Sequence, residues 1–388
     1  MKIAQVNSYY YPFMIGGAEW YVRNVSRELS KAGNDVTVFT ARKSGGEKAP
    51  AEEVFEGVRI RRFPLRLDLT YRLKVWDGLK EALLEGDFDI IHTYDYAQQH
   101  SVDALRAASK KGAGSALTVF DVHSTIPRVW YKRVPMMYLD SYFARRTFPA
   151  ASRILVRAPN LVEGLPGLNG YREKVRVSPS GARDESFGRF DGGKFRQKHS
   201  IGDTPLVLFM GRLNPLKGPQ ILLEAVPGLS KAFPGATFAF VGPDQGGFKA
   251  HLEKRASELG VTSSVRFTGM IADFEEKMQA YSACDVFVLP TSYEGTSQAI
   301  FEAMSQGKPV VASRVGGVPF QIEDGKQGFL VEHGNVEELS ERVARVLRGG
   351  PEIQQMGREA RSRAEEFRYS RLVQGLQTVY GEILKVGN

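Results

Sequence analysis

Short apolar runs alternate with amphipathic stretches from the first residues of the chain onward. The apolar run at 2–6 predicts a strand, and a glycine-bearing loop separates it from an amphipathic stretch at about 19–32 that predicts a helix. Gly33 follows this helix at the position where a left-handed residue commonly ends one. The run at 35–40 predicts the next strand. Strand, glycine turn, helix and strand in this order form the unit of a doubly wound parallel sheet.

The same alternation occurs in two blocks. In the first block, further strands are predicted near 90–91, in 115–124 (SALTVFDVHS), at 153–156 and at 175–177. A polar, glycine-rich stretch follows, and then strands alternate again with helices in PLVLFMG, ATFAFVG, SVRFTG, DVFVLP, PVVAS and GFLV. The chain ends in helical patterns at 354–367 and 370–385. The expected fold class is therefore α/β, with two Rossmann-like, doubly wound parallel-sheet domains.

Length supports this division, because 388 residues exceed what one ordinary core accommodates. We predict a first domain at 1–185, a linker at 186–203, a second domain at 204–369, and a C-terminal helix at 370–388 that packs back toward the first domain.

Composition excludes several classes of protein. Cys284 is the only cysteine, which rules out an intramolecular disulfide and a cysteine-based metal cluster, and its apolar surroundings predict a small buried side chain. The amino-terminal sequence has no apolar signal region, and no apolar run approaches the roughly 18 residues of a membrane span. We therefore expect a cytoplasmic protein, or one that lies on a membrane without crossing it.

The net charge of +8 is unevenly placed, since residues 1–185 carry +7 of it. Two basic stretches also contain aromatic residues, and the first contains methionines as well, a mixture that suits anionic lipid headgroups. We expect an anionic membrane surface or a lipid-linked acceptor rather than nucleic acid, and a solvated basic face over core aromatics is the competing interpretation. The first stretch has the cations Arg128, Lys132, Arg133, Arg145, Arg146, Arg153 and Arg157, one acid, Asp140, and Trp130, Tyr131, Met136, Met137, Tyr138, Tyr142, Phe143 and Phe148 between them. The second has Arg59, Arg61, Arg62, Arg66, Arg72, Lys74 and Lys80, with Trp76.

The first segment with candidate chemistry is GRLNPLKG at 211–218, directly after a predicted strand and before a predicted helix. Its glycines allow the backbone to approach a ligand, while Arg212 and Lys217 supply two fixed positive charges. Paired cations suit a leaving diphosphate, whose negative charge grows as a sugar–oxygen bond breaks. A solvated turn with ordinary surface cations is the alternative.

The second segment is EGTSQAIFE, which begins at Glu294 and ends at Glu302. Pro290 ends the preceding strand, so this segment lies at the carboxyl end of a strand, where open α/β sheets bind ligands. Glu302 lies one to two helical turns beyond Glu294, and the two carboxylates can therefore meet different parts of one ligand. Glutamates with this spacing are also common on protein surfaces.

Ser297 is the predicted N-cap of a helix that Gly307 ends. The start of such a helix leaves backbone amides unpaired, and these bind phosphate or sugar oxygens well. The expected amides are those of Ser297, Gln298 and Ala299.

Two glycine pairs complete the pattern. Gly16 and Gly17 lie in the first loop of the first domain, from which they could contact a diphosphate, although a tight turn explains them equally well. Gly316 and Gly317 follow the PVVAS strand and form another turn at a strand end.

Together these segments resemble the retaining glycosyltransferases of family four, which have the GT-B fold. The resemblance covers nearly the whole chain, including VRVSPSGARDESF and EDGKQGFLV, and the combination of GRLNPLKG, the two spaced glutamates and EAMSQGKPVVASRVGG is specific. It implies two Rossmann-like domains facing across a cleft, with an acceptor domain first and a donor domain second. It also implies a hexosyltransferase that takes a sugar from a UDP- or GDP-linked donor to a glycan or lipid-linked acceptor.

The resemblance assigns roles to individual residues. It implies that Arg212 and Lys217 hold the diphosphate, that Glu294 approaches the sugar and that Glu302 binds the ribose hydroxyls. It also implies that no cofactor or metal ion is needed, since the two cations neutralise the leaving group. The full set of candidate donor-site residues is Gly16, Gly17, Gly211, Arg212, Lys217, Glu294, Ser297, Gln298, Ala299 and Glu302.

The chain departs from the family pattern at three places. Phe120 stands where the family often has a histidine near the transferred sugar, so either Asp121 or His123 takes that catalytic place or the acceptor geometry differs. A simple core or surface role for His123 is an equal alternative. Phe320 replaces a frequent acidic residue after GGVP, and Ser180 replaces the usual asparagine before Gly181.

Two other functions remain open at this level. A nucleotide-sugar epimerase of the same architecture would need acids and histidine over the sugar, which GRLNPLKG does not favour. A non-catalytic protein that binds sugar nucleotides or polyanions would not need the four charged residues Arg212, Lys217, Glu294 and Glu302 together.

Overall fold

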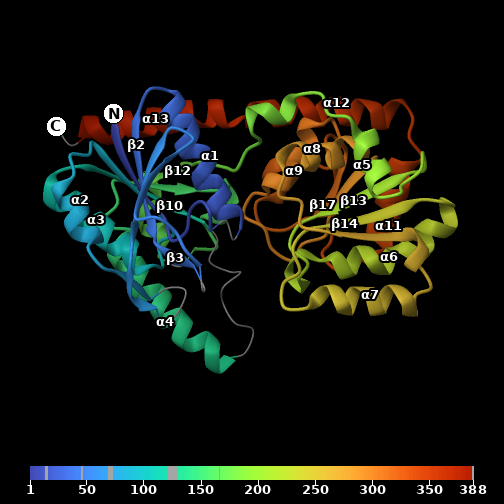
Figure 1. The fold of residues 1–388 in the computed structure, drawn as a ribbon, viewed down its shortest axis with the longest axis horizontal. Coiled ribbons are helices and arrows are strands. Elements are labelled where there is room, and N and C mark those ends of the chain that lie inside the picture. Colours follow the sequence, from blue (N-terminus) through green and yellow to red (C-terminus); the bar gives the residue numbers. More distant parts are fainter. Residues whose placement is uncertain (14–15, 45–46, 69–72, 121–129, 166, 387–388) are drawn as a thin grey trace. The chain divides into compact units, whose positions relative to one another are not determined.

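The structure is a computed structural model that describes residues 1–13, 16–44, 47–68, 73–120, 130–165 and 167–386. The chain forms two compact units, one of residues 1–179 with 369–388 and the other of residues 180–368 (Figure 1).

The first unit is built on an eight-stranded sheet in the order β12-β11-β10-β9-β1-β2-β6-β5. Only β5 pairs antiparallel within this sheet, so the predicted parallel α/β fold is confirmed. Its strands are β1 (Lys2–Val6), β2 (Asp35–Ala41), β5 (Glu52–Phe55), β6 (Val58–Phe63), β9 (Ile90–Tyr94), β10 (Gly114–Val119), β11 (Arg153–Val156) and β12 (Val175–Val177). Two short antiparallel pairs lie outside it: β3 (Lys43–Ser44) with β4 (Glu47–Lys48), and β7 (Leu65–Asp68) with β8 (Lys74–Trp76).

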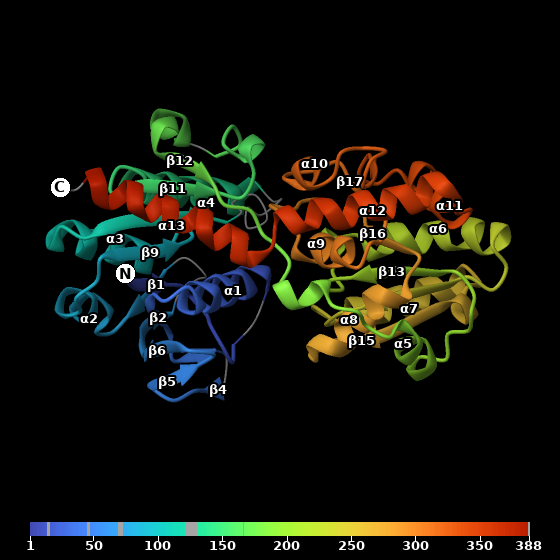
Figure 2. The same cartoon turned by 90° about the horizontal axis from the view of Figure 1, so that it is seen from above.

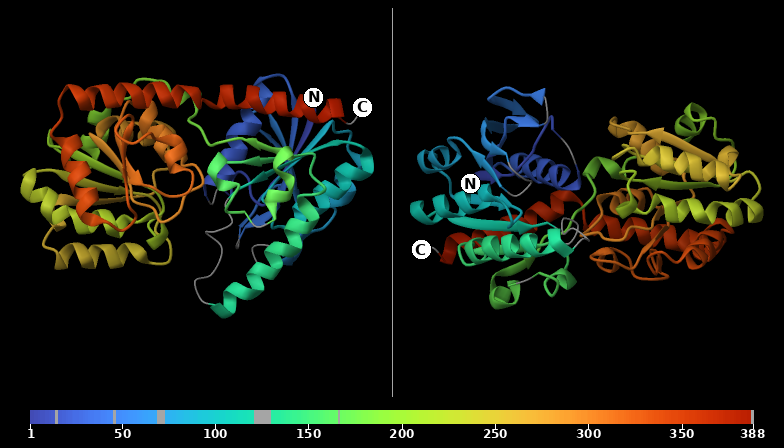
Figure 3. Two further views of the ribbon diagram at one scale, coloured as in Figure 1. Left: turned by 180° about the vertical axis from the view of Figure 1, so that it is seen from behind. Right: turned by 90° about the horizontal axis from the view of Figure 1, so that it is seen from below.

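Helices cover both faces of this sheet (Figure 2). The core on one face joins α1 (Gly17–Lys31) and α13 (Tyr369–Val386) to the strands, through side chains such as Val22 and Leu376. The core on the other face includes Leu83 and Ala107 from α2 (Leu79–Glu85) and α3 (Gln99–Lys111). The fifth helix, α4 (Trp130–Thr147), packs beside α3 and extends beyond the sheet of its own unit (Figure 3).

A buried hydrogen-bond network fixes α13 to the sheet. The imidazole of His92 lies 2.6 Å through Nδ1 from the Tyr380 hydroxyl and 2.7 Å through Nε2 from the Thr118 hydroxyl. Because His92 is fully buried, desolvation lowers its pKa from 6.5 to about 3. The ring is therefore neutral in the folded protein at neutral pH.

This pKa predicts acid sensitivity of the first unit. Between pH 6.5 and 3 the unfolded chain binds a proton at His92 that the folded chain rejects, so the free energy of unfolding falls as pH falls through this window. From pH 6.5 to 5, His92 alone should account for a loss of about 2 kcal/mol, which His92→Gln should abolish. The equally buried His100 of the same unit, whose pKa burial lowers to about 4, should keep its own loss of similar size in the variant. Urea unfolding followed by tryptophan fluorescence measures it, because all three tryptophans (Trp20, Trp76 and Trp130) belong to the first unit. An equal pH dependence in the variant would contradict the assignment.

The second unit is built on a six-stranded parallel sheet in the order β15-β14-β13-β16-β17-β18. The central strands are buried at every position, as expected of parallel strands covered on both faces. The strands are β13 (Leu206–Met210), β14 (Thr237–Val241), β15 (Val265–Gly269), β16 (Val286–Leu289), β17 (Val310–Ser313) and β18 (Gly328–Val331). The helices are α5 (Gly192–Lys198), α6 (Pro219–Ala232), α7 (Phe248–Glu258), α8 (Phe274–Ala283), α9 (Gln298–Ser305), α10 (Val318–Gln321), α11 (Val336–Leu347) and α12 (Pro351–Glu366).

The predicted linker at 186–203 is not an unstructured connection. It contains α5, which belongs to the second unit and packs against α8. Asp191 caps this helix by accepting a hydrogen bond from the Gly193 amide, and Phe195 is its one fully buried apolar anchor. A helix with a single apolar anchor has almost no periodicity, which explains the error, and the two units divide between Pro179 and Ser180 instead.

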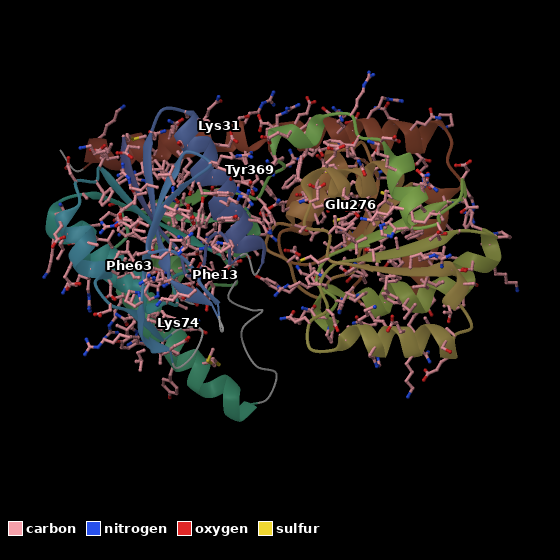
Figure 4. The ribbon with its side chains drawn as sticks, in the orientation of Figure 1. Phe13, Lys31, Phe63, Lys74, Glu276 and Tyr369 are labelled. Atoms are coloured by element: carbon pink, nitrogen blue, oxygen red, sulfur yellow. The ribbon has the colours of Figure 1, made fainter. Side chains whose placement is uncertain are left out.

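Part of the second basic stretch is structural, because Arg62 and Lys74 are buried, whereas the cations Arg59, Arg66 and Lys80 are exposed and Arg72 lies outside the described residues. Residues 58–63 form β6, and the Arg62 side chain is buried in an ion pair with Glu53. Lys74, labelled in Figure 4, is also buried and lies 3.4 Å from Asp68, and Trp76 is 5% exposed. Arg61 pairs with Glu52 on the surface. The expectation of a lipid-facing surface here is therefore wrong for the buried side chains of this stretch.

Cys284 is buried, as predicted, and burial raises its thiol pKa to about 12. Within the described ranges, no helix combines the length and the apolar character that a membrane span requires.

Candidate functional site

The carboxyl ends of three neighbouring strands carry the predicted donor-site residues. In the second unit β13, β16 and β17 lie side by side and run parallel, so the loops that follow them emerge at one edge of the sheet. These loops carry Arg212 and Lys217, then Glu294, then Gly316. Loops at this edge are where open α/β sheets bind ligands.

Two glycines let the three loops touch. Gly218 has φ +75°, and a Cβ there would overlap the Pro290 carbonyl at the end of β16. Gly316 has φ +49°, and a Cβ there would overlap the Glu294 carbonyl, to which the Gly317 amide donates at 2.9 Å. The backbone that carries Glu294 is therefore held directly by the loop after β17.

Lys217 and Glu294 form an ion pair. The Lys217 ammonium lies 2.5 Å from Glu294 Oε2, and the two side chains are only 20% and 14% exposed. The Asn214 side chain accepts a hydrogen bond from the Lys217 amide, while the Leu216 carbonyl accepts one from the Ser292 amide. Both ends of the ion pair thus stand on loops that are hydrogen-bonded to each other.

Arg212 is different. Across the part of the chain that the structure describes, its half-buried guanidinium makes no hydrogen bond or ion pair. Gly211, just before it, donates its amide to the Val241 carbonyl at 2.9 Å. An unpaired guanidinium beside a lysine on a fixed loop is chemically suited to a polyvalent anion.

Glu302 lies on α9 and is more deeply buried than Glu294, with 4% of its side chain exposed against 14%. Its Oε1 accepts from the Lys277 ammonium at 2.6 Å and from the Gln298 amide group at 2.8 Å. Its Oε2 accepts from the Tyr281 hydroxyl at 3.1 Å. Burial, with the Glu302 charge next, raises the pKa of Tyr281, so this phenol remains a donor.

One part of the predicted amide cradle is wrong. Ser297 is the N-cap of α9, but its amide is not available to a ligand, because it donates to Gln321 Oε1 at 2.7 Å. Gln321 is fully buried and also donates to the Ser297 carbonyl at 2.8 Å. Gln298 and Ala299 begin the helix as predicted, and the Gln298 side chain is directed to Glu302.

In the first unit, Gly16 and Gly17 lie at the start of α1. Gly16 is the N-cap of α1 and donates its amide to Glu19 Oε2 at 2.7 Å, and Gly17 is the first residue of that helix. Asp121 and His123 lie outside the described residues. Phe120, the departure from the family histidine, packs against Tyr21 and Tyr94.

Three residues near this edge were missed by sequence reasoning. Lys277 and Tyr281 on α8 and Gln321 on α10 each bind a predicted site residue or its backbone. The i, i+4 spacing of Lys277 and Tyr281 was the available signal, since it places both on one helix face. Within the described segments, no group of three or more His, Cys, Asp or Glu side chains is arranged to hold a metal ion.

Both halves of the chain match known family models. Residues 15–185 match the model described as glycosyltransferase family 4, and residues 192–363 match the one described as glycosyl transferases group 1. The D-inositol 3-phosphate glycosyltransferase of Acidothermus cellulolyticus is 28% identical over 396 residues, covering 95% of this chain and 86% of the relative. The protein of the same name from Saccharomonospora viridis is 28% identical over 400 residues, covering 95% and 90%.

Solved structures share the fold. The sucrose-phosphate synthase of Thermosynechococcus elongatus superposes with a TM-score of 0.78 at 21% identity, covering 99% of both chains. Anabaena HepE in complex with UDP superposes with a TM-score of 0.80 at 20% identity, covering 98% of this chain and all of the other. The architecture is thus GT-B, as the sequence predicts. The two family models together span most of the sequence, and the chain belongs to the glycosyltransferases of family four.

Proposed function

We propose that this glycosyltransferase moves a hexose from a nucleotide-diphosphate sugar to an acceptor hydroxyl with retention of anomeric configuration. The supporting observation is the Arg212 guanidinium, which has no hydrogen-bond or ion-pair partner among the described residues and lies on the same loop as Lys217, whose ammonium is held by Glu294. Family membership supports the reaction class, and retention follows the family resemblance. The uridine nucleotides in HepE structures, one of which contains UDP-glucose, support a UDP-linked donor, with a GDP-linked donor as the alternative.

The ion pair gives Glu294 and Lys217 linked roles. When the bond between the sugar C1 and the diphosphate oxygen breaks, the electron pair stays on the diphosphate, and cations that bind its oxygens stabilise this charge. When the Lys217 ammonium turns to bind the diphosphate, it leaves the Glu294 carboxylate. Glu294 can then accept hydrogen bonds from sugar hydroxyls, while Arg212 holds the phosphate from its own position. Glu302 would bind the ribose hydroxyls of the same donor.

A panel of nucleotide sugars tests this function. The purified protein is incubated with UDP- and GDP-linked hexoses, with and without lipid-linked glycan acceptors, and free nucleoside diphosphate is measured. We expect release from one donor class, stimulated by acceptor. An epimerised sugar nucleotide without release would instead indicate the epimerase, and binding without any turnover would indicate a non-catalytic binding protein.

We also propose that no divalent metal is required, because Arg212 and Lys217 supply the positive charge that a metal would provide. Transfer in EDTA is therefore expected to equal transfer in magnesium within about twofold, since each fixed cation acts without a metal bridge. Rates measured after chelation and again after adding magnesium or manganese check this. Loss of activity in EDTA that either metal restores would contradict metal independence.

For the acceptor we propose a lipid-linked glycan at an anionic membrane surface. The support is α4, where Met137, Tyr138 and Tyr142 are 51%, 76% and 43% exposed, next to the exposed cations Arg145 and Arg146. Not all of the first basic stretch contributes, because Phe143, Phe148 and Arg157 are buried. Arg128 and the side chains of residues 130–135 lie outside the described part of the chain.

Reversing Arg145 and Arg146 to glutamate is expected to weaken binding to anionic liposomes about tenfold or more, since each cation near such a surface contributes about 1 kcal/mol. Binding of the unmodified protein should also fall with salt, because exposed charges are screened. Co-sedimentation with anionic and neutral vesicles across a salt series measures this. The matched control reverses Arg106 and Lys110, an exposed cation pair on α3. Equal loss in the control, or equal binding to neutral vesicles, would contradict α4 as the docking surface.

A further inference from the structure

The Glu302 carboxylate accepts three hydrogen bonds from protein side chains. Lys277 and Gln298 bind its Oε1, and Tyr281 binds its Oε2. A carboxylate offers roughly four lone-pair positions, so three donors leave about one for a ligand hydroxyl. The remaining capacity belongs to Oε2, the oxygen with a single partner.

Lys277 supplies the only formal positive charge that the structure places on this carboxylate among the described residues. It lies in the first turn of α8, is 19% exposed, and has its ammonium 5.8 Å from the centre of the Phe274 ring. A glutamate with 4% of its side chain exposed is costly to ionise without such a partner. Gln298 and Tyr281 are neutral donors, which orient the carboxylate but do not balance its charge.

We propose that Lys277 is the positioning residue of the nucleotide site: its ammonium holds Oε1 of Glu302 and so directs Oε2 toward one hydroxyl of the ligand's ribose. The proposal rests on the proposed function, because it takes the ligand to be a ribonucleoside diphosphate that reaches Glu302. On this proposal, the Lys277–Glu302 pair distinguishes ribose from deoxyribose, rather than Glu302 by itself.

The expected consequence is a binding defect with a chemical signature. In Lys277→Met, Glu302 loses its charge partner and becomes a weaker acceptor, so nucleotide affinity should fall about tenfold or more. Because this contact is made in both ground and transition states, KM for the donor should rise while kcat changes little. Lys277→Arg keeps the charge and should restore most of the affinity.

The test is calorimetric titration of wild type, Lys277→Met and Lys277→Arg. The probes are UDP and GDP, followed by the 2′-deoxy and 3′-deoxy forms of whichever binds more tightly. The wild type should prefer the ribonucleotide over one deoxy form by about tenfold, and Lys277→Met should reduce this preference to about twofold or less. Lys249→Met is the control, because Lys249 forms a comparable but exposed pair with Glu253 in the same unit. Melting temperatures of all variants show whether each is folded.

The outcomes separate this proposal from the proposed function. If Lys277→Met keeps the wild-type preference for the ribonucleotide over its deoxy form, the positioning role is overturned, whether or not overall binding is weaker. The nucleotide-sugar function is then left intact. A fall in kcat as large as the rise in KM would also overturn it, because a merely structural loss would affect both. If Lys277→Met does not fold, Lys277→Arg decides. A folded Lys277→Arg that lacks the wild-type preference for the ribonucleotide over its deoxy form contradicts the role of the charge. If the wild type binds neither UDP nor GDP, both proposals fail together.

Discussion

Alanine at Lys217 or Arg212 is expected to lower turnover by about 100-fold or more, because removing one fixed donor that stabilises developing negative charge typically costs that much. The two variants should differ in stability. Arg212 has no partner within the described residues, so Arg212→Ala should melt like the wild type. Lys217→Ala leaves the Glu294 carboxylate, only 14% exposed, without its cation and should melt at a lower temperature.

Steady-state rates at saturating donor and thermal melts measure both effects. Lys249→Ala is the matched control, since Lys249 pairs with Glu253 on the surface of α7 and should behave like the wild type in both assays. If turnover in a folded Arg212→Ala or Lys217→Ala stays within about threefold of the wild type, that residue does not stabilise the leaving group. A loss of this size is far smaller than the loss expected when a charge-stabilising donor is removed.

Alanine at Gly316 is expected to reduce turnover by about 100-fold, although Gly316 offers a ligand no side chain. Its Cβ would overlap the Glu294 carbonyl, so the backbone that carries this carboxylate must move. A displacement of about 1 Å at a reacting group can cost this much in rate. The prediction therefore tests whether Glu294 must stand where the loop after β17 holds it.

Gly325→Ala separates this effect from backbone strain. Gly325 also has positive φ, +81°, but a Cβ there would meet nothing within 4 Å. Both variants should lose some stability from a left-handed alanine, while only Gly316→Ala should lose most of its turnover. Equal rates for the two variants would show that the position of Glu294 is not critical.

Sequence periodicity predicted the parallel framework well, because its strands are short, apolar and buried on both faces. The runs at 2–6 and 153–156 became β1 and β11 with the predicted bounds. The strand at 58–63 was missed, because its arginines lie between apolar residues and the stretch was interpreted by charge. Burial of Arg62 depends on Glu53, a partner that a run of charges does not reveal.

The candidate site divides in the same way. Spacing along the chain could place Glu294 and Glu302 after a strand, since the strand and helix that flank them have clear patterns. It could not show that the Ser297 amide is occupied, because Gln321 reaches it from a helix 24 positions away. Nor could it show that Lys277 holds Glu302, since that pair joins two helices across the packed interior of the second unit. Contacts of this kind are set by tertiary packing.

The anomeric configuration of the first product tests the proposed reaction most directly. The enzyme is incubated in EDTA with its best nucleotide sugar and a hydroxyl acceptor, and the anomeric proton coupling of the new glycoside is measured by NMR beside the amount of nucleoside diphosphate released. We expect an α-linked product from an α-linked donor, with one nucleoside diphosphate released per glycosidic bond formed. A β-linked product, or release without any new glycosidic bond, would contradict retaining transfer from a nucleotide sugar.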